Sequence, residues 1–222
     1  LLSVVYGNNQ FITVGDSGII LTSPDGSIWT ERSSGTSHDL YSVVYGNNQF
    51  ITVGDSGTIL ISVDGTTWTA ISPVTENRLY SATYGNNQFI VVGLSGTILT
   101  SPDGKTWTEQ SSGTKGTLSS VAYGNNQFIT ICSGRYPEFI DTILTSSDCV
   151  TWTARSYLTE NYWLYSVTYG NDQFIAVGLS GTILTSPDGA TWVVRLSGTQ
   201  KPLYSVTYGN NQFIAVGGGG AI

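Results

Sequence analysis

Apolar and polar positions alternate in short runs along this chain, and turn-forming residues separate the runs. In the segment 40–78, the run Leu-Tyr-Ser-Val-Val-Tyr at 40–45 alternates two sets of side chains with a period of two, which is typical of a half-buried β-strand. The runs at 49–53, 58–62 and 66–70 are also rich in β-branched or aromatic residues. Gly, Asn and Asp stand between the runs, and these residues suit tight turns. The pattern therefore predicts four antiparallel strands in this segment.

One phrase, Tyr-Gly-Asn-Asn-Gln-Phe, recurs along the whole chain. It occurs six times, once with Asp172 in place of the second Asn, at spacings of 39, 39, 39, 46 and 39 residues. A fixed period of this length without helical signals indicates stacked β-units, and four antiparallel strands per unit form a β-propeller blade. A β-solenoid is the alternative, but its coils are shorter and lack three hairpin turns per repeat. We therefore predict an all-β protein, a β-propeller of four-stranded antiparallel blades.

The repeats divide the 222 residues into five complete units and a partial sixth. We predict a single β-propeller domain or fragment over residues 1–222, because this length suffices for repeats that share one core. The repeats are expected at 1–39, 40–78, 79–117, 118–163, 164–202 and, in part, 203–222. The sixth stops inside its expected third strand and the chain has no methionine, which favours truncation of a longer repeat array. A tolerated incomplete blade and pairing of two copies through unpaired strand edges are the alternatives.

The third turn of each repeat has a recurrent sequence. It reads Ser-Pro-Asp-Gly-Ser-Ile-Trp at 23–29, Ser-Val-Asp-Gly-Thr-Thr-Trp at 62–68 and, in a degenerate copy, Ser-Ser-Asp-Cys-Val-Thr-Trp at 146–152. This pattern resembles the Asp-box (BNR) repeat of sialidase-like and photosystem-assembly-factor-like propellers, with one residue fewer between Asp and Gly. The resemblance implies the same blade architecture and says little about function, because fold and function are separable. The residues of these boxes are Asp25, Trp29, Asp64, Trp68, Asp103, Trp107, Asp148, Trp152, Asp188 and Trp192.

We expect the box residues to be structural. An Asp can accept hydrogen bonds from backbone N–H groups of its own turn, and a Trp can bury a large apolar surface where adjacent blades pack. A metal site is disfavoured because each turn offers one carboxylate, whereas calcium takes about 6–8 oxygen ligands. We predict no metal and no cofactor.

The two cysteines stand where other repeats have glycine. Cys132 aligns with Gly54 at the end of a strand, and Cys149 aligns with Gly65 in the third turn. Five residues of strand separate such positions by about 15 Å, whereas a disulfide joins Cα atoms within about 7 Å. We therefore predict two free thiols.

Composition narrows the choice of partner and location. Charged residues make up 10% of the chain, against roughly 25% in an average domain, and this weakly charged polar surface favours a secreted or cell-surface protein. The net charge of −7 argues against nucleic acid and anionic membranes, which attract a basic face. No run of 18 or more apolar residues occurs, so we expect no insertion into a membrane.

The two ends of each predicted blade differ in how much the repeats vary. The first and third turns are nearly identical from copy to copy, whereas the second turns and the connections between blades differ. Variable loops on a rigid frame are where binding usually lies. The fourth repeat has a six-residue insertion in its second turn and extra aromatic residues in its outgoing connection. The candidate ligand-binding residues are Arg135, Tyr136, Glu138, Phe139, Tyr157, Tyr162 and Trp163.

Exposed aromatic rings with a few polar groups suit sugar faces or peptide side chains. Packing of the insertion against its own blade is the alternative. Catalysis is disfavoured: the sialidase-like family uses three converging arginines, and here Arg32, Arg155 and Arg195 fall just past the box strands of different repeats, toward the expected outer rim. The single histidine, His38, lies in a polar connection without a Ser-His-Asp arrangement.

We therefore predict a non-catalytic recognition or scaffold propeller with no catalytic residues, whose partner is a glycan or a protein surface. Carbohydrate binding is the sharper hypothesis. Association of copies through unpaired blade edges is a further hypothesis. The alternatives are a glycoside hydrolase-like propeller with catalytic residues outside this sequence, and an artificial or amplified repeat array without an evolved ligand.

Overall fold

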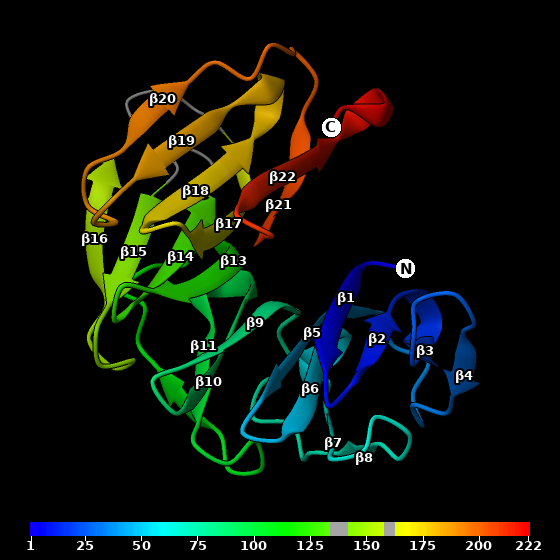
Figure 1. The fold of residues 1–222 in the computed structure, drawn as a ribbon. Coiled ribbons are helices and arrows are strands. Elements are labelled where there is room, and N and C mark those ends of the chain that lie inside the picture. The colour runs from blue at the N-terminus through cyan, green and yellow to red at the C-terminus, as the bar shows by residue number, and fades with distance from the viewer. Residues whose placement is uncertain (134–141, 158–162) are drawn as a thin grey trace. The chain divides into compact units, whose positions relative to one another are not determined.

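A computed structural model describes residues 1–133, 142–157 and 163–222 of the chain. Within these residues the strands form five four-stranded antiparallel sheets and one two-stranded sheet, and the strand order in each sheet follows the chain (Figure 1). Each sheet is one blade, numbered 1 to 6 along the chain. The chain divides into two compact units, residues 1–110 and 111–222. The prediction of a single domain stays a prediction.

The first unit contains blades 1 to 3. Its strands are β1 (Ser3–Gly7), β2 (Gln10–Val14), β3 (Ile20–Ser23), β4 (Thr30–Arg32), β5 (Leu40–Gly46), β6 (Gln49–Gly54), β7 (Ile59–Ser62), β8 (Thr69–Ala70), β9 (Leu79–Gly85), β10 (Gln88–Gly93), β11 (Ile98–Ser101) and β12 (Thr108–Gln110).

The second unit contains blades 4 and 5 and the two-stranded blade 6. Its strands are β13 (Thr117–Gly124), β14 (Gln127–Ser133), β15 (Thr142–Ser146), β16 (Thr153–Tyr157), β17 (Leu164–Gly170), β18 (Gln173–Gly178), β19 (Ile183–Ser186), β20 (Val193–Arg195), β21 (Leu203–Gly209) and β22 (Gln212–Gly217).

The second turn of most blades is a single 3-10 turn rather than an open hairpin. These turns are η1 (Asp16–Gly18), η2 (Asp55–Gly57), η3 (Leu94–Gly96), η4 (Leu179–Gly181) and η5 (Gly218–Gly220). The middle serine of η2, Ser56, has a φ of 52°, and Gly57 has a φ of 67°. A side chain at Gly57 would overlap the carbonyl group of Thr75, so the turn and the connection to the next blade are packed tightly together. No helix in the described parts of the chain is long and apolar enough to cross a membrane.

The Asn-Asn pair of the recurrent phrase forms the first turn of every blade. In blade 1 the pair lies between the bonded residues Gly7 and Gln10, and Asn8 and Asn9 have φ values of 46° and 58°. Two successive positive φ values define a tight hairpin whose twist matches that of the strands, and Asn adopts them at little cost. The same geometry recurs in the other five copies, Asp172 included.

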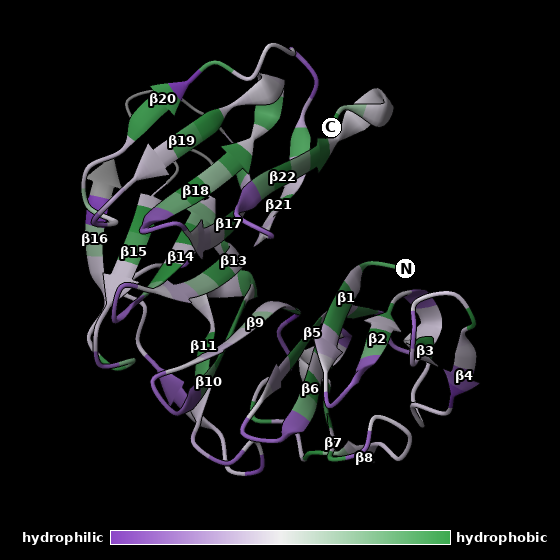
Figure 2. Cartoon of the chain, viewed as in Figure 1, coloured by the Kyte–Doolittle hydropathy of each residue, from purple (hydrophilic) through white to green (hydrophobic). Residues whose placement is uncertain are grey.

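The apolar core lies along the second and third strands. Phe50, Phe89, Phe128 and Phe174, which follow the Asn-Asn-Gln of their repeats, are fully buried. Figure 2 shows apolar residues concentrated along strands such as β18 and β19. Each cluster of buried side chains draws on two consecutive blades: Ile51 and Ile61 of blade 2 pack with Phe89 and Trp107 of blade 3. Burial thus couples neighbouring sheets within a unit.

Consecutive blades are also joined by repeated polar links. In blades 1, 2 and 4, the Gln after the Asn-Asn pair donates its side-chain amide to the backbone carbonyl of the box Asp in the next blade, at 2.8 Å from Gln49 to Asp103. Gln10 and Gln127 make the equivalent bonds, also at 2.8 Å. In blades 1, 2, 4 and 5, a Ser on the first strand accepts a hydrogen bond from a backbone N–H of the next first strand, at 3.2 Å from Val43 to Ser3. The recurrent segment therefore has two structural roles: its Asn-Asn pair forms the hairpin, and its Gln joins the blade to the next one.

The box carboxylates stabilise the third turn from inside. The Asp64 carboxylate accepts hydrogen bonds from the backbone N–H groups of Thr66 at 2.8 Å and Thr67 at 2.9 Å, and from the Ser62 hydroxyl at 3.0 Å. The Trp68 indole donates to the Gly65 carbonyl at 3.1 Å. These hydrogen bonds, that from the backbone N–H of Thr67 above all, hold the pKa of Asp64 far below its usual range. Asp25, Asp103, Asp148 and Asp188 have the same kind of partners and the same direction of shift.

The box tryptophans are not buried equally. Trp107 packs on blade 2 and is 7% exposed, whereas Trp29 is 37% exposed. Within the first unit, Trp29 contacts Phe11 of its own blade, with ring centroids 6.5 Å apart. The expectation that a box indole is buried where blades pack is confirmed for Trp107 and stays a prediction for Trp29.

The two cysteines form no disulfide, as predicted, and both side chains are buried. Cys132 pairs with Leu118 as Gly54 pairs with Leu40, which confirms the alignment of repeats. Cys149 has a φ of 68°, the conformation that Gly65 has in blade 2. Burial, and then the nearby Asp148 carboxylate, raises the pKa of the Cys149 thiol to about 11, so this thiol stays protonated near neutral pH.

Candidate binding surface

The second turn of a blade and the connection that enters the blade lie together, as the sequence predicted. The backbone N–H of Asp55 in η2 donates to the carbonyl of Asp39 at 2.9 Å, and that of Leu94 in η3 donates to Arg78 at 2.8 Å. Equivalent bonds join Leu179 to Trp163 at 3.2 Å and Gly218 to Pro202 at 2.8 Å. We call the end of a blade that is formed by its second turn and connections the variable end, and the opposite end, with the first and third turns, the constant end.

The connections are of two kinds, and the kinds alternate. Ser-Gly-Thr occurs at 34–36, 112–114 and 197–199, after blades 1, 3 and 5, whereas Thr-Glu-Asn occurs at 75–77 after blade 2 and at 159–161 after blade 4. In the first kind the Ser34 hydroxyl donates to the Thr36 carbonyl at 3.2 Å. In the second kind the Asn77 side chain donates to the Thr97 hydroxyl of the next blade at 2.9 Å. Comparing connections two repeats apart, rather than one, would have found this alternation in the sequence.

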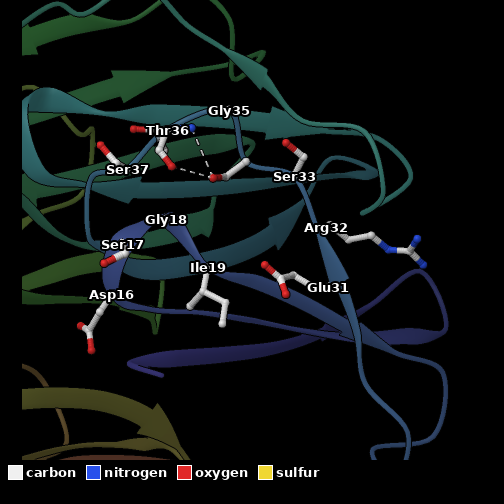
Figure 3. A pocket seen from close by; sticks show the side chains of 11 residues that line it. Asp16, Ser17, Gly18, Ile19, Glu31, Arg32, Ser33, Gly35, Thr36 and Ser37 are labelled. Carbon is white, nitrogen blue, oxygen red and sulfur yellow. Dashed lines mark hydrogen bonds between the residues drawn. The ribbon is translucent and has the colours of Figure 1, made fainter.

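Open hollows lie between the second turns and the connections. In blade 1 a hollow of about 570 Å³ is lined by residues 16–19 and 31–37 (Figure 3). Its lining is mostly hydroxyl and charged groups, and Figure 3 shows Arg32 extending away from Asp16. A similar hollow of about 470 Å³ follows residues 180–182 and 194–200 in blade 5. The blade 1 hollow is open and polar, so it suits polar contacts with a partner better than enclosure of an apolar ligand. The blade 5 hollow is more apolar, because Val194 and Leu196 line it.

Tyrosines pair across the first strands near the variable end. The rings of Tyr41 on β5 and Tyr80 on β9 have centroids 5.5 Å apart at an interplanar angle of 45°, and Tyr165 and Tyr204 of the second unit are 5.5 Å apart at 50°. The four residues occupy the second position of their repeats. Sequence reasoning missed these pairs, although Tyr at this position in four of six repeats was a visible signal.

A charged cluster adjoins the tyrosine pair of the first unit. The Arg78 guanidinium Nε lies 2.7 Å from the Asp55 carboxylate, and the Tyr41 hydroxyl donates to the same oxygen at 3.0 Å. Burial, and then the hydrogen bond to Asp55, raises the pKa of Tyr41 to about 12. Tyr41 therefore remains a donor under all physiological conditions. The Arg78 side chain is 55% exposed, which leaves part of its guanidinium facing solvent.

The variable end of the first unit is acidic as a whole. Its carboxylates outnumber its two arginines, Arg32 and Arg78; they belong to Asp16, Glu31, Asp39, Asp55 and Glu76. Two of them have partners inside the protein: Asp39 accepts from the backbone N–H of Ser17 at 2.7 Å, and Asp55 binds Arg78 and Tyr41. This end therefore offers carboxylates beside two adjoining aromatic rings that are tilted against each other.

Most of the binding residues predicted from the sequence fall where the structure gives no placement. Arg135, Tyr136, Glu138, Phe139 and Tyr162 lie outside the described residues. Tyr157 is the last residue of β16, and its backbone pairs with Thr142. Trp163 lies at the variable end of the second unit, where its side chain is exposed and its carbonyl binds η4.

The arginines considered for catalysis are each bonded within their own blade. Arg32, Arg155 and Arg195 lie on fourth strands, and each donates to a Thr of the adjacent third strand, at 3.0, 2.9 and 3.0 Å. His38 contacts the Thr58 hydroxyl at 2.8 Å through its ring Nδ1. Among the residues that the structure places, no three His, Cys, Asp or Glu side chains are arranged to hold a metal ion.

Comparison with known proteins identifies a family. The family model described as DUF6242 beta propeller domain matches residues 2–112, which is half of the chain and nearly coincides with the first unit. No curated protein matches the chain.

Solved structures share the fold at low sequence identity. YCF48 bound to a D1 peptide is 18% identical with a TM-score of 0.74, over 98% of this chain and 75% of that one. Selenomethionine-substituted virginiamycin B lyase from Staphylococcus aureus is 14% identical with a TM-score of 0.83, over 94% and 74%. YCF48 from Cyanidioschyzon merolae is 18% identical with a TM-score of 0.58, over 99% and 93%. These likenesses confirm the predicted all-β propeller fold.

Proposed function

The chain belongs to the DUF6242 beta propeller domain family, and we propose that it is a non-catalytic recognition module that binds a protein segment at the variable end of its blades. The third turns of this propeller are, in this proposal, Asp-boxes of the BNR kind, whose role is to hold the blades. Secretion or display at the cell surface is part of the same proposal, and it rests on the weakly charged composition.

The observation that carries the proposal is the cluster of Tyr41, Tyr80, Asp55 and Arg78. The paired tyrosines offer large, rigid apolar area together with hydroxyl groups, a combination enriched where proteins bind one another. The constant end supports binding less well, because its side chains are already used to join blades.

The charge of the surface favours a basic partner segment. Carboxylates surround the tyrosine pair, and the net charge of the chain is −7, so complementary charge on the partner would steer its approach. Lys and Arg side chains can also lie over the tyrosine faces. A related fold, YCF48, has been solved bound to a D1 peptide, which agrees with a peptide as ligand class without defining its sequence.

The test is binding of fluorescent peptides of defined sequence, basic and acidic, together with a glycan array. We expect basic peptides to bind, and Tyr80→Ala and Asp55→Asn to weaken that binding at least tenfold. Asp172→Asn is the matched control: it makes the same chemical change at the constant end and restores the residue found in the other five repeats. It should leave affinity within twofold of the parent chain.

Three other results would contradict the proposal. Binding to glycans alone, lost in Trp163→Ala or Tyr136→Ala, would replace the protein partner with a carbohydrate. Equal losses of peptide affinity in Asp55→Asn and Asp172→Asn would show that the peptide does not bind specifically at the variable end. Turnover of a glycoside panel would support the hydrolase alternative.

A further inference from the structure

The fourth strand of blade 5 differs from the equivalent strands in the chemistry of its side chains. The segment reads Thr-Glu-Arg-Ser at 30–33 in blade 1, Thr-Glu-Gln-Ser at 108–111 in blade 3 and Val-Val-Arg-Leu at 193–196 in blade 5. Three positions that are polar in blades 1 and 3 are therefore apolar in blade 5. Val194 is 55% exposed and Leu196 is fully exposed, so these apolar side chains face solvent rather than a core.

The exposed residues lie at the outer edge of the blade and not on a face that a neighbouring blade covers. Blade 5 lies between blades 4 and 6 in the second unit: Leu184 of β19 packs in a cluster with blade 4, and Val177 of β18 packs in a cluster with blade 6. β20 is the outermost strand of this sheet and pairs only with β19 among the described strands (Figure 1). The fourth strands of the other four-stranded sheets likewise pair only with the third strand of their own blade. Packing between neighbouring blades therefore leaves this edge uncovered.

An apolar hollow adjoins this edge. Val194 lies opposite Leu184 in the strand pairing, and residues opposite each other in an antiparallel pair share a face of the sheet, so Val194 extends the apolar row of Leu184 to the rim. Val194 and Leu196 line the hollow of about 470 Å³. The Arg195 side chain lies on the other face of β20, where its Nε donates to the Thr185 hydroxyl at 3.0 Å. The end of β20 therefore presents apolar side chains on one face and a basic side chain on the other.

The charges around this hollow differ from those around the blade 1 hollow. Arg195 and the exposed Lys201 are the only charged residues of the sequence between the third turn of blade 5 and the first strand of blade 6. The blade 1 hollow has Asp16 and Glu31 in its lining. Glu31 also places a charge on the edge strand β4, and charged side chains on an edge hinder pairing with a further strand. On β20 the position of Glu31 is taken by Val194, so this edge is apolar and basic and lacks an acidic side chain.

From these observations we propose that blade 5 binds an extended protein segment in which apolar and acidic side chains alternate. The segment pairs its backbone with the free edge of β20 as a fifth strand of the sheet. Its apolar side chains lie on Val194 and Leu196, and its carboxylates lie near Arg195 and Lys201. Backbone pairing gives affinity in this mode of recognition, and the alternate side chains give specificity. Opposite charge favours an acidic partner over a basic one.

The first test measures the affinity of the full chain for three fluorescent peptides of about six residues, the usual length of a strand. One peptide alternates Val and Glu, the second alternates Val and Lys, and the third alternates Ser and Glu. We expect the Val-Glu peptide to bind about tenfold or more tightly than the other two, because only this peptide matches both the apolar and the basic side chains of the edge. Absence of binding by the Val-Glu peptide, or equal binding by either of the others, would overturn the proposal.

The second test gives blade 5 the side chains of blade 1. Val194→Glu combined with Leu196→Ser introduces the residues found at 31 and 33, and we expect the affinity for the Val-Glu peptide to fall about tenfold or more. Both positions are exposed, so denaturant unfolding of this double variant should match that of the parent. Val63→Ser is the matched control, because it removes an exposed valine at the constant end, and it should leave the affinity within about twofold of the parent. Unchanged affinity in the double variant would contradict binding at β20.

The site on blade 5 is independent of the function proposed above. The tyrosine cluster lies in the first unit and favours a basic segment, whereas this edge lies in the second unit and favours an acidic one. Tyr80→Ala should therefore leave the affinity for the Val-Glu peptide within about twofold of the parent. Equal losses of this affinity in Tyr80→Ala and in the double variant would mean that the peptide has no separate site on blade 5.

The third test asks whether the peptide pairs as a strand. The backbone N–H groups of alternate residues in a strand point to opposite edges. Two forms of the Val-Glu peptide are therefore compared, one N-methylated on its Val residues and the other on its Glu residues. We expect only the form whose methyl groups face away from β20 to bind, and equal affinities of the two forms would overturn the proposal. Association of the parent chain without peptide, measured by sedimentation velocity and lost in the double variant, would assign the edge to a second copy instead.

Discussion

The constant and variable ends of the blades are built from the same strands but differ in what their side chains do. At the constant end, the Gln49 amide and the Trp107 indole each contact a group that belongs to a turn or to another blade. At the variable end, the backbone bonds between turn and connection are kept, but the side chains change: Asp55 in η2 is Leu94 in η3 and Gly218 in η5. Side chains that are the same in every repeat contact a turn or the next blade. Side chains that differ between repeats lie where the backbone bonds alone hold the turn to the connection.

The largest effect should come from the junction between blades 2 and 3. Trp107→Ala removes a buried indole, and we expect a loss of about 3–5 kcal/mol in the free energy of unfolding. Arg78→Gln breaks a solvent-exposed ion pair and should cost no more than about 1 kcal/mol. Denaturant unfolding of both variants measures the difference. A greater loss of unfolding free energy in Arg78→Gln than in Trp107→Ala would mean that the variable end, rather than the constant end, stabilises the fold.

Two box tryptophans, Trp29 and Trp107, allow a comparison of an exposed indole with a buried one. Trp29→Ala changes a tryptophan that is 37% exposed, against 7% for Trp107, and we expect a loss in the free energy of unfolding well below that of Trp107→Ala. Equal losses, measured by the same unfolding experiment, would mean that the indole stabilises its own turn rather than the junction between blades.

Acid should weaken the constant end through the box carboxylates. The backbone N–H of Thr106, followed by that of Lys105, lowers the pKa of Asp103 in the folded protein, while an unfolded Asp has a pKa of about 3.9. A lowered folded pKa contributes stability above the unfolded value, and this stability is lost as pH falls through the folded value. The unfolding midpoint should therefore drop as pH falls below about 4.

Asp103→Asn sharpens the acid test. Its amide oxygen can accept the same hydrogen bonds but does not titrate, so the variant should show a shallower decline below about pH 4 than the parent. Denaturant titrations at a series of pH values measure both slopes. Identical slopes would show that the Asp103 carboxylate does not contribute to acid sensitivity.

The smallest effect concerns the one box that departs from the pattern. Cys149 has a φ of 68°, which a residue with a side chain adopts at a cost. Cys149→Gly should raise the free energy of unfolding by about 0.5–1 kcal/mol, with loss of the buried thiol offsetting part of the gain. Gly65→Cys is the reciprocal variant and should destabilise, because a Cβ atom there lies 2.7 Å from the Ile12 side chain. A destabilised Cys149→Gly would show that packing of the thiol outweighs backbone strain.

The blade fold could be predicted from the sequence because each repeat carries the same strand and turn signals. The Asn-Asn hairpins, the Asp-Gly-Trp turns and the period of two in the strands each act locally, over a few residues. Cys132 and Cys149 could be placed from sequence for the same reason: neighbouring repeats supplied the frame. The burial of each Trp could not be predicted locally, because Trp107 packs on side chains of a neighbouring blade that its own repeat does not encode.

The binding surface was harder to predict because its contacts join separate repeats. Asp55 and Arg78 are 23 positions apart, and the Tyr41–Tyr80 pair crosses a blade junction. Their partnership depends on the stagger of neighbouring first strands, which no single repeat encodes. The aromatic insertion of repeat 4 drew attention by composition, and the prediction for Arg135, Tyr136, Glu138, Phe139, Tyr157, Tyr162 and Trp163 stays a prediction.

The uniformity of the blade junctions has a consequence for how such a gene can change. Within the units, a tyrosine of one blade lies against a glycine of the blade before it, as Tyr84 does against Gly46, so a duplicated pair of blades would meet the glycine, tyrosine, glutamine and tryptophan that it needs. Pairs of blades, which keep the alternation of the two kinds of connection, can therefore be gained or lost by recombination between near-identical stretches of coding sequence, without new compensating mutations. The number of blades is then the property of this protein that changes most easily, and the shape of an individual blade is the property that changes least easily.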